Sequence, residues 1–507
     1  MLTDQDKYQI REKGISEEQI NWQLSVFKKG IDPVKLDRPA SVGDGILRPD
    51  EKAVRQYLAV FEEANDVRKI KFVPASGAAS RMFKALFEFM DEAGGDGQDP
   101  GDEFIRTFFS NIRKFAFCDN LEEIIGSQGG SLETMLQKKQ YREILTYLLT
   151  GKGLNYGNLP KGLLQFHKYG SESKTPFEEH IAEAVEYTKS RNGEVSVHFT
   201  VSPEHRQEFM TLLNAVKQEY EDKYNIRLDI SFSVQKPSTD TMAVDRQNDP
   251  FREPDGSILF RPGGHGALIG NLQDLDADLI FIKNIDNVVP EKFREPTIRY
   301  KKILAGVLLK ARDRVFEFLR ELDDNPPGRE RLKEMYEYIT NDLHYIPAQQ
   351  IDLSDTEAAR QRFKSILDRP LRVCGVVKNL GEPGGGPFWA PNSRGDLTLQ
   401  IVESSQVDQG DAKQVETFGN STHFNPVDLV CATKNYREEK FYLADYIDSN
   451  TCFISEKSKD GRDLKALELP GLWNGAMADW LTLMVEVPVE TFNPVKTVND
   501  LLRKEHQ

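Results

Sequence analysis

The sequence predicts an α/β fold built on a doubly wound, mainly parallel central sheet flanked by helices. The main observation is an alternation of segments in the middle of the chain. Strands are predicted at 194–201, 227–234 and 278–283, and helices near 177–190 and 203–222 separate the first of them. Strands that alternate with helices are typical of parallel sheets. With 39% apolar residues among 507, the chain has ample material for a large core.

A second observation is an earlier unit of strand, turn and helix. Lys69–Pro74 reads as a short strand and leads into a turn of small residues at 75–80. From Arg81, the segment 81–87 has helical character. A helix N-terminus that follows small residues lets backbone N–H groups approach a phosphate closely. An ordinary tight turn between strand and helix explains the same pattern, so both interpretations stay open.

Helices are predicted at the start of the chain and in an insertion. Residues 1–66 read as helices, with a capping-box pattern at 16–19. A polar, glycine-rich loop at 91–97 follows the first strand unit, and 102–150 carries apolar residues at helical spacing. We therefore predict a helical insertion over 87–159, which is long enough to fold over a site.

The second half of the chain is predicted to be first helical and then β-rich. Residues 297–345 read as two helices joined at 325–328. Residues 371–455 look β-rich, apart from the glycine-rich stretch at 381–387. At 491–502 the pattern is an extended stretch followed by a helix capped at Thr497 or Asn499, which would leave Lys496 on the surface.

Charge and cysteine content narrow the class of protein. Lys and Arg number 66 and Asp and Glu number 81, and the net charge of −15 argues against a nucleic-acid coat or an anionic membrane surface. The four cysteines form no CxxC pair, which favours buried free thiols in a reducing cytosol over a disulfide scaffold or a zinc cluster. No secretory leader and no apolar run of roughly 18 residues is present, so we expect a cytoplasmic protein. The cysteines are Cys118, Cys374, Cys431 and Cys452.

Lys161 belongs to a small motif on a predicted loop. It lies between Pro160 and Gly162, which restrict the backbone around it. A lysine held in this way can place a point charge on a phosphoryl oxygen. A solvated side chain is the ordinary state of any single lysine, so this alternative stays open.

Two further loops carry polar groups. In 261–266, three glycines after a proline let the backbone approach a flat ligand such as a base or a sugar, and His265 can donate a hydrogen bond. The strand at 278–283 runs into Asn284–Asn287, which puts Asp286 at the carboxyl edge of the sheet, where ligands bind in open α/β folds. A single carboxylate there suits Mg²⁺, which also uses phosphate oxygens and water. A hairpin-like turn and an Asx-turn explain the same two segments without a ligand.

Other reaction types find less support in the sequence. The eight scattered histidines give no Ser/His/Asp triad, and no HExxH motif is present. The glycines at 384–387 lack the GxxxxGK[ST] pattern of a phosphate-binding P-loop. Metal-dependent phosphoryl chemistry without a protein nucleophile is therefore the better fit.

Taken in order, these segments resemble the UDP-sugar pyrophosphorylase family. UDP-glucose and UDP-N-acetylhexosamine pyrophosphorylases are the most similar in these short motifs, and the chain looks like a divergent bacterial branch of the family. The resemblance covers about 70–86 and 158–505 and implies a GT-A-type, Rossmann-like nucleotidyltransferase fold. The segments that carry it are the loop ending in Arg81-Met82, Pro-Lys-x-Leu-Leu at 160–164, Pro-Gly-Gly-His-Gly at 262–266, Asn-x-Asp-Asn at 284–287 and Phe-x-Pro-Val-Lys-Thr at 492–497.

The resemblance implies that the first loop holds a triphosphate and that Arg81 contacts the departing pyrophosphate. The family loop reads roughly Gly-Gly-x-Gly-Thr-Arg, and here two of its glycines are replaced by Ser76 and Ala79. If those positions need a positive φ, triphosphate binding is weakened. The loop residues expected at the triphosphate are Ser76, Gly77, Ala78 and Ser80.

The resemblance also implies how the remaining groups divide. Lys161 and Lys496 would contact the reacting phosphates, and Asp286 would hold magnesium. Gln235 resembles the glutamine that reads the uracil edge, with Gly264 beside it and His265 near the phosphates or the sugar. The positions expected at the sugar are Gly385, Glu403 and Asn420.

The implied activity is transfer of a nucleotidyl group, uridylyl being favoured, from a nucleoside triphosphate to a sugar-1-phosphate, with release of pyrophosphate. UTP and a sugar-1-phosphate would be the partners, Mg²⁺ the cofactor, and no nucleic acid or membrane would take part. The implied regions are a helical N-terminal region (1–66), a catalytic domain with the helical insertion (67–455) and a C-terminal segment that completes the site (456–507).

Three alternatives remain at this stage. The altered loop can leave a nucleotide-sugar binding module that does not catalyse. The same fold can serve a glycosyltransferase that uses a metal–diphosphate site. All five segments can also be plain turns of a structural α/β protein. The sugar and the oligomeric state are not readable from one chain.

Overall fold

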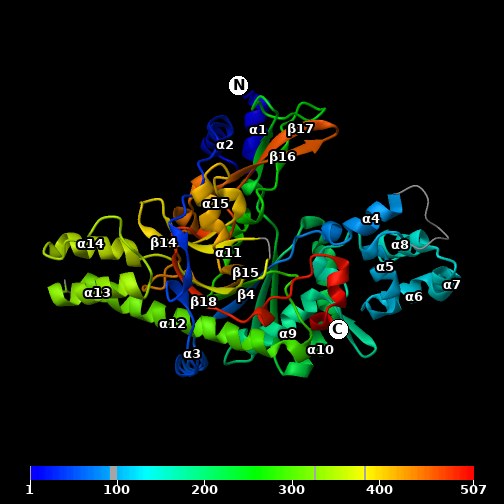
Figure 1. Cartoon of the computed structure of the whole chain (residues 1–507), viewed down its shortest axis with the longest axis horizontal. Coiled ribbons are helices and arrows are strands. Elements are labelled where there is room, and N and C mark those ends of the chain that lie inside the picture. The colour runs from blue at the N-terminus through cyan, green and yellow to red at the C-terminus, as the bar shows by residue number, and fades with distance from the viewer. Residues whose placement is uncertain (1, 92–99, 325–326, 382–383) are drawn as a thin grey trace. The chain divides into compact units, whose positions relative to one another are not determined.

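The computed structural model describes residues 2–91, 100–324, 327–381 and 384–507 (Figure 1). The chain divides into two compact units, each made of several stretches of sequence. Unit 1 comprises Met1–Lys69, Val234–Ile282 and Tyr300–Val489, and unit 2 comprises Ile70–Ser233, Lys283–Arg299 and Glu490–Gln507. The three regions expected from the sequence are not tested by this division and stay a prediction.

Unit 2 contains three parallel strands and two long helices at the predicted places. The strands pair in the order β4 (Lys69–Pro74), β7 (Glu194–Thr200), β8 (Arg227–Ser233). Helices α9 (Pro176–Thr188) and α10 (Arg206–Tyr224) connect them along the chain. β4 and β7 are buried along nearly their whole length, as expected for parallel strands covered on both faces.

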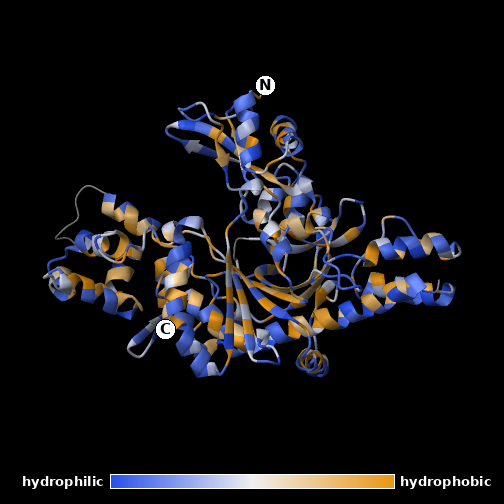
Figure 2. Cartoon of the chain, turned by 180° about the vertical axis from the view of Figure 1, so that it is seen from behind, coloured by the Kyte–Doolittle hydropathy of each residue, from blue (hydrophilic) through white to orange (hydrophobic). Residues whose placement is uncertain are grey.

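Unit 1 contains a larger, mainly parallel arrangement of strands. Neighbours from β2 through β12 run parallel, whereas β12 and β15 are antiparallel. In Figure 2 the strands are largely hydrophobic, which places the core along the sheet. The α/β class and the mixed, mainly parallel sheet expected from the sequence are confirmed. The order is β2 (Ser41–Val42), β3 (Gly45–Leu47), β18 (Leu481–Glu486), β12 (Leu371–Lys378), β15 (His423–Ala432), β11 (Leu279–Lys283).

Two antiparallel sheets of unit 1 account for the β-rich region and extend it. One contains β1 (Arg38–Pro39), β13 (Gly386–Pro391) and β14 (Leu397–Val402) in that order. The expected β-rich stretch is therefore confirmed, although its residues Glu382 and Pro383 lie outside the described residues. The other sheet has the order β10 (Phe260–Arg261), β9 (Thr241–Val244), β17 (Arg462–Glu468), β16 (Phe453–Lys459).

The N-terminal region is only partly helical. Its helices are α1 (Asp4–Glu12), α2 (Glu17–Lys29) and α3 (Glu51–Glu63). The predicted capping box at Ser16 is present, with Gln19 as the reciprocal partner. The expectation of helices throughout 1–66 is wrong for β1, β2 and β3, because a proline and two glycines at positive φ interrupt that stretch.

The remaining helices of unit 1 follow the predicted pattern. The two helices expected at 297–345 are α12 (Glu295–Asp324) and α13 (Arg329–Asn341), and Asn325 and Pro326 in their predicted joint lie outside the described residues. α14 (Thr356–Leu367) packs against α13 (Figure 1). The shorter helices are α11 (Ile269–Asp274) and α15 (Ala412–Gly419).

The predicted insertion in unit 2 is helical. The expected helix from Arg81 is wrong in detail, because a 3-10 turn at Ala79–Arg81 comes first and α4 begins at Lys84. One reason is that the Met82 carbonyl accepts a hydrogen bond from the Val498 N–H at 3.1 Å, outside any helix. The predicted glycine-rich loop falls on 92–97, outside the described residues, and a β5 (His167–Tyr169) and β6 (Glu172–Lys174) hairpin follows the insertion. The helices are α4 (Lys84–Asp91), α5 (Glu103–Ser110), α6 (Cys118–Ser127), α7 (Leu132–Gln137) and α8 (Tyr141–Leu149).

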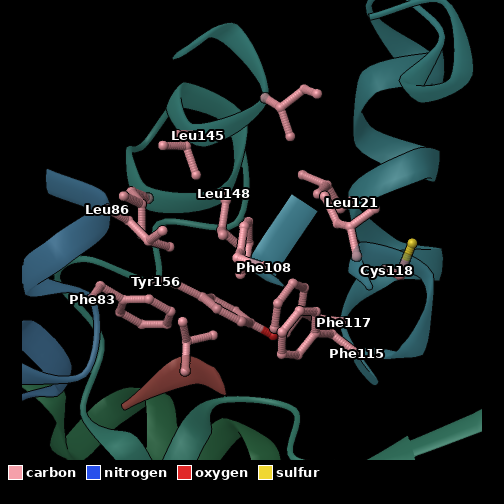
Figure 3. Close-up of a cluster of buried hydrophobic side chains, with 14 of the residues drawn as sticks. Phe83, Leu86, Phe108, Phe115, Phe117, Cys118, Leu121, Leu145, Leu148 and Tyr156 are labelled. Carbon is pink, nitrogen blue, oxygen red and sulfur yellow. The ribbon is translucent and has the colours of Figure 1, made fainter. Parts of the chain in front are cut away.

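An aromatic core holds the insertion together (Figure 3). The rings of Phe115 and Phe117 stack with centroids 5.0 Å apart, and Phe108 lies 5.1 Å from Phe115. Each fully buried ring contributes on the order of 2–3 kcal/mol. Val495 and Val498 belong to the same buried cluster. The insertion and the predicted Lys496 segment are therefore parts of one packed body.

Two expectations from composition can be checked directly. The four cysteines are free and buried, as predicted. Among the helices of the described ranges, none combines the length and the apolar character needed to cross a membrane.

Candidate functional site

The first predicted loop lies on the surface of unit 2, directly after β4. Ser76, Gly77, Ala78, Ser80 and Arg81 are all exposed. The loop is held from one side by the segment that carries Lys161. Ala78 and Pro160 form an isolated β-bridge, the Ala79 N–H donates to the Leu159 carbonyl at 3.3 Å, and the Lys161 N–H donates to the Gly77 carbonyl at 3.3 Å.

The two substitutions in this loop cause no backbone strain. Neither Ser76 nor Ala79 has a positive φ, and a Cβ added at Gly77 would meet no atom within 4 Å. The conformation is therefore open to residues other than glycine. The difference from a helix N-terminus is real, however, because only a three-residue 3-10 turn follows and the Ala79 N–H is already used inside the protein.

Lys161 and Asp286 form an ion pair at the ends of their two segments. The Lys161 Nζ lies 2.8 Å from Asp286 Oδ2 and donates a second hydrogen bond, of 2.7 Å, to the Val495 carbonyl. Their side chains are 14% and 19% exposed. The two residues predicted to contact phosphate and magnesium are thus brought together, although they are 125 positions apart in the sequence.

The Asn-x-Asp-Asn turn also positions the segment that carries Lys496. The Asn287 Oδ1 accepts a hydrogen bond from the Asn493 N–H at 2.8 Å, and its amide donates to the Thr491 carbonyl at 3.2 Å. The Val495 N–H donates to the Asp286 carbonyl at 3.2 Å. Lys496 follows as an exposed residue, as predicted. Lys161 and the backbone of the Lys496 segment thus both contact Asp286.

Thr497 caps the turn after Lys496. Its side chain and that of Asp500 form a capping box, and the Lys496 N–H also donates to Asp500 Oδ2 at 2.8 Å. Of the two predicted caps, Thr497 is correct and Asn499 is wrong. The expected helix is a five-residue 3-10 segment, Val498–Leu502.

A fully buried histidine supports the Asp286 turn from inside unit 2. The Nε2 of His180, on α9, lies 3.1 Å from the carbonyl oxygens of Asn284 and of Ile285. Because both partners are acceptors, Nε2 carries the proton. Burial holds the pKa of His180 well below its usual value, so the ring is neutral. Its Nδ1 atom is buried and has no hydrogen-bond partner.

A buried group of charges holds the strands that lead to both loops. Glu183 on α9 pairs with Lys71 of β4 at 2.9 Å and with Lys283 of β11 at 2.8 Å, and all three side chains are at most 2% exposed. Although burial alone raises the pKa of the Glu183 carboxyl, the two lysines hold that pKa well below its usual value.

The predicted nucleoside and sugar residues belong to unit 1. Gly264 has a φ of +78°, and a Cβ there would lie 3.3 Å from Glu468 Oε2. The Nδ1 of His265 accepts a hydrogen bond from the Leu472 N–H at 3.0 Å, so Nε2 carries the proton. The ring stacks on Trp473 with centroids 4.5 Å apart. Burial lowers the pKa of His265, and the nearby carboxylates of Glu403 and Glu468 oppose this shift.

Two of the predicted sugar residues, Gly385 and Glu403, lie side by side. The third, Asn420, precedes a residue that lies beside Gly386. A Cβ added at Gly385 would be 3.4 Å from Glu403 Cγ. Asn420 is exposed at the end of α15, where its N–H donates to the Glu416 carbonyl. A Cβ at Gly386 would be 2.9 Å from Ser421 Oγ, so the chain neighbours of Gly385 and Asn420 are in contact. Gly385 and Glu403 are thus neighbours, and the Glu403 carboxylate also acts on the pKa of His265.

Gln235 follows β8 and is the second residue of the stretch Val234–Ile282 of unit 1. Its amide Nε2 is buried and has no hydrogen-bond partner. An unpaired buried amide costs roughly 1–3 kcal/mol, so this donor would be stabilised by an acceptor on a ligand. That property fits the predicted reading of a base edge.

A family model described as "Domain of unknown function (DUF4301)" matches residues 3–507. The chain belongs to this family. No curated protein matches it.

Solved structures that match most of the chain at low sequence identity include the following three. A variant of UDP-glucose pyrophosphorylase from Leishmania major shares 15% identity, with a TM-score of 0.45 over 99% of this chain and 79% of that one. Another variant of that enzyme, in complex with UDP-glucose, shares 15% identity, with a TM-score of 0.44 over 99% and 79%. The uridine diphosphate N-acetylglucosamine pyrophosphorylase from Trypanosoma brucei, in complex with inhibitor, shares 12% identity, with a TM-score of 0.44 over 96% and 74%.

The donor set of this DUF4301 chain fits one kind of magnesium site. Within the described ranges no group of three or more His, Cys, Asp or Glu side chains could hold a metal ion. A protein cage for a metal is thus absent from the described residues. Asp286 is a single carboxylate beside lysines that suit phosphates, and Mg²⁺ often takes one carboxylate and completes its shell with phosphate oxygens and water. The residues fit an ion that arrives with a polyphosphate.

Several supporting residues are invisible to pattern reasoning. Lys71 and Lys283 lie in apolar strands, and nothing local marks Glu183 as their partner. His180 and Glu183 are three positions apart on one helix face, which is the one signal that points to a polar buried side. In unit 1, Trp473 and Glu468 contact the predicted loop from a segment that the sequence did not single out.

Proposed function

We propose that this protein is a nucleotidyltransferase that transfers a nucleotidyl group, uridylyl being favoured, from a nucleoside triphosphate to a sugar-1-phosphate and releases pyrophosphate. The observation that supports this proposal best is the Lys161–Asp286 pair of 2.8 Å, flanked by the segment of the exposed Lys496. Lys161 beside a single carboxylate that follows β11 suits a metal-bound polyphosphate.

The chemistry needs no covalent enzyme intermediate. A phosphate oxygen of the sugar-1-phosphate attacks the α-phosphorus in line, the new P–O bond forms, and the bond to pyrophosphate breaks. The protein then has to align the reactants and neutralise the charge that develops on the phosphoryl oxygens. We assign Arg81 to the leaving pyrophosphate, and Lys161 and Lys496 to the reacting phosphates.

Asp286 is the residue that would hold Mg²⁺. When bound, the ion would neutralise phosphate charge and help to align the oxygens. The chain's own contribution is to fix that carboxylate: the Val495 N–H and His180 hold the backbone of the turn on two sides. The loop residues Ser76, Gly77, Ala78 and Ser80 would contact the triphosphate from their exposed positions.

We assign recognition of the nucleoside and the sugar to unit 1. The unpaired amide of Gln235 would read the base, and Gly264 would let the backbone approach it. The Nε2–H of neutral His265 would donate to a ligand oxygen, and the Glu403 carboxylate would accept from sugar hydroxyls, close to Gly385. Asn420 would contact the sugar from the end of α15. With four buried free cysteines, we propose a cytoplasmic location.

The test is pyrophosphate release with Mg²⁺ over a grid of nucleoside triphosphates and sugar-1-phosphates. We expect release with one pair, UTP among the active triphosphates, and its loss in Asp286→Ala. The matched control is Asp119→Ala, which removes an exposed carboxylate of the same unit that pairs with Lys168. Release that persists in Asp286→Ala would contradict the assignment.

A binding module without catalysis is the second candidate, and one observation favours it. The loop after β4 has no α-helix N-terminus, and its Ala79 N–H is bonded within the protein, so it offers fewer backbone donors to a triphosphate. Thermal stabilisation by UDP-sugars, together with silence across the whole grid, would support this candidate over the enzyme.

A further inference from the structure

The Lys161–Asp286 pair joins the two groups that the proposed function assigns to different ligands. The proposed function assigns Lys161 to phosphate and Asp286 to a metal ion. In this structure the two side chains neutralise each other, with Lys161 Nζ 2.8 Å from Asp286 Oδ2. Lys161 Nζ has three protons, of which Asp286 and the Val495 carbonyl take two. The site in this state therefore offers little net attraction to either ligand alone.

We propose that this ion pair couples the binding of a divalent cation to the binding of a polyphosphate. Either ligand alone has to break the pair and leaves one charge without its partner. A metal–polyphosphate complex replaces both halves at once, because the cation takes Asp286 and the phosphate takes Lys161. This inference rests on the proposed function for the identity of the ligands.

The backbone on both sides of the pair is fixed, so the exchange concerns the side-chain ends. A Cβ at Gly162 would lie 2.9 Å from the Phe209 ring and 3.3 Å from Ile285 Cδ1, which shows how closely the Lys161 turn is packed. The turn of Asp286 is held by Val495 and His180. Neither residue can retreat from the other with its main chain.

Burial makes the broken pair costly. Both side chains are less than one-fifth exposed, so water replaces a lost partner incompletely. A cation alone on Asp286 would leave Lys161 without its carboxylate partner, next to the Val495 carbonyl of the segment that carries Lys496. A polyphosphate alone on Lys161 would leave the Asp286 carboxylate among phosphate oxygens. Coupling between two ligands is typically about 5–150-fold, and it is the same in both directions.

The experiment measures three dissociation constants on the full chain: Mn²⁺ alone, pyrophosphate in EDTA, and pyrophosphate in excess Mn²⁺. Calorimetry reports all three, and the spin-resonance signal of free Mn²⁺ reports the first independently. In the natural chain we expect pyrophosphate to bind at least about tenfold more tightly with Mn²⁺ than without it.

Two variants should shift these constants in opposite senses. Lys161→Met frees the carboxylate, so Mn²⁺ alone should bind about tenfold more tightly while metal-free pyrophosphate binds more weakly. Asp286→Asn frees the lysine, so metal-free pyrophosphate should bind more tightly while Mn²⁺ alone is lost. In both variants the coupling should fall towards one. Lys168→Met, which breaks an exposed pair of the same unit, should leave all three constants unchanged.

The outcomes separate this inference from the proposed function. If Lys161→Met leaves the Mn²⁺ constant unchanged in a folded protein, the inference is wrong whatever the reaction is. If pyrophosphate and UTP fail to bind under every condition, the proposed function fails, and the Mn²⁺ constants still decide whether the pair guards the carboxylate. Should Lys161→Met not fold, Asp286→Asn decides through metal-free pyrophosphate, where no gain in affinity would overturn the coupling.

Discussion

The two units of this protein use charge in different ways. Unit 2 pairs Lys161 with the single carboxylate of Asp286 and also contains a fully buried group of two lysines and one glutamate. Unit 1 offers glycine turns, a neutral histidine stacked on a tryptophan, and carboxylates near it. Fixed cations suit the phosphates that all nucleotides share, whereas neutral donors and carboxylates suit hydroxyls and base edges. Changes in unit 2 should therefore act on every nucleotide alike, and changes in unit 1 on selectivity.

The largest expected effect on stability comes from Glu183→Gln in unit 2. This change removes the buried carboxylate that pairs with both Lys71 and Lys283, and breaking a buried ion pair typically costs about 3–5 kcal/mol. Urea unfolding of the full chain should show the loss. Glu88→Gln removes an exposed partner of Lys84 in the same unit and should change the free energy by less than about 0.5 kcal/mol. A loss below about 1 kcal/mol in Glu183→Gln would mean that the buried charges are not balanced as described.

The next effect concerns activity. Lys496→Ala should lower turnover about 10²–10³-fold, because it removes a cation from the reacting phosphates. Lys496 is exposed, so the thermal midpoint should hardly move. Steady-state kinetics with several nucleotides and a thermal melt test both statements. The loss should be similar for every nucleotide that the protein accepts, and full activity in the variant would remove the basis of the phosphate assignment.

Unit 2 should also lose stability in acid. The buried His506 lies 3.0 Å from His167, and burial lowers the pKa of His506 to about 3. The unfolded chain takes up this proton at a pKa of about 6.5, so unfolding gains protons and the stability falls as the pH drops from about 6.5 to 3. At pH 4.5, His506 should account for about 2–3 kcal/mol. Urea unfolding at about pH 6.5 and at about pH 4.5 tests this. In His506→Phe the free energy of unfolding should depend less on pH. An equally steep curve in the variant would assign the loss to other groups.

Comparison of the two kinds of contact shows what a sequence can reveal. β4 begins and ends at the predicted residues, because an apolar run bounded by a small-residue turn is a local signal. The helices of the insertion follow from their spacing for the same reason. The sequence predicts Lys161 and Asp286 as two separate site residues but does not predict that they pair, because only the fold brings together positions that are 125 apart. The sequence does not predict that Lys71 and Lys283 pair with Glu183, because nothing local distinguishes a buried lysine in a strand from a solvated one.

The smallest expected effect would sharpen the division between the units. His265→Phe keeps a ring on Trp473 but removes the Nε2–H donor, so binding of a UDP-sugar should weaken by about 5–15-fold, which is the net value of about one hydrogen bond. Under the proposed function pyrophosphate would contact the groups of unit 2, so its affinity should not change. Calorimetry with both ligands measures the ratio. If both affinities fell together, His265 would serve the phosphates, and the assignment of neutral donors to selectivity would fail at this residue.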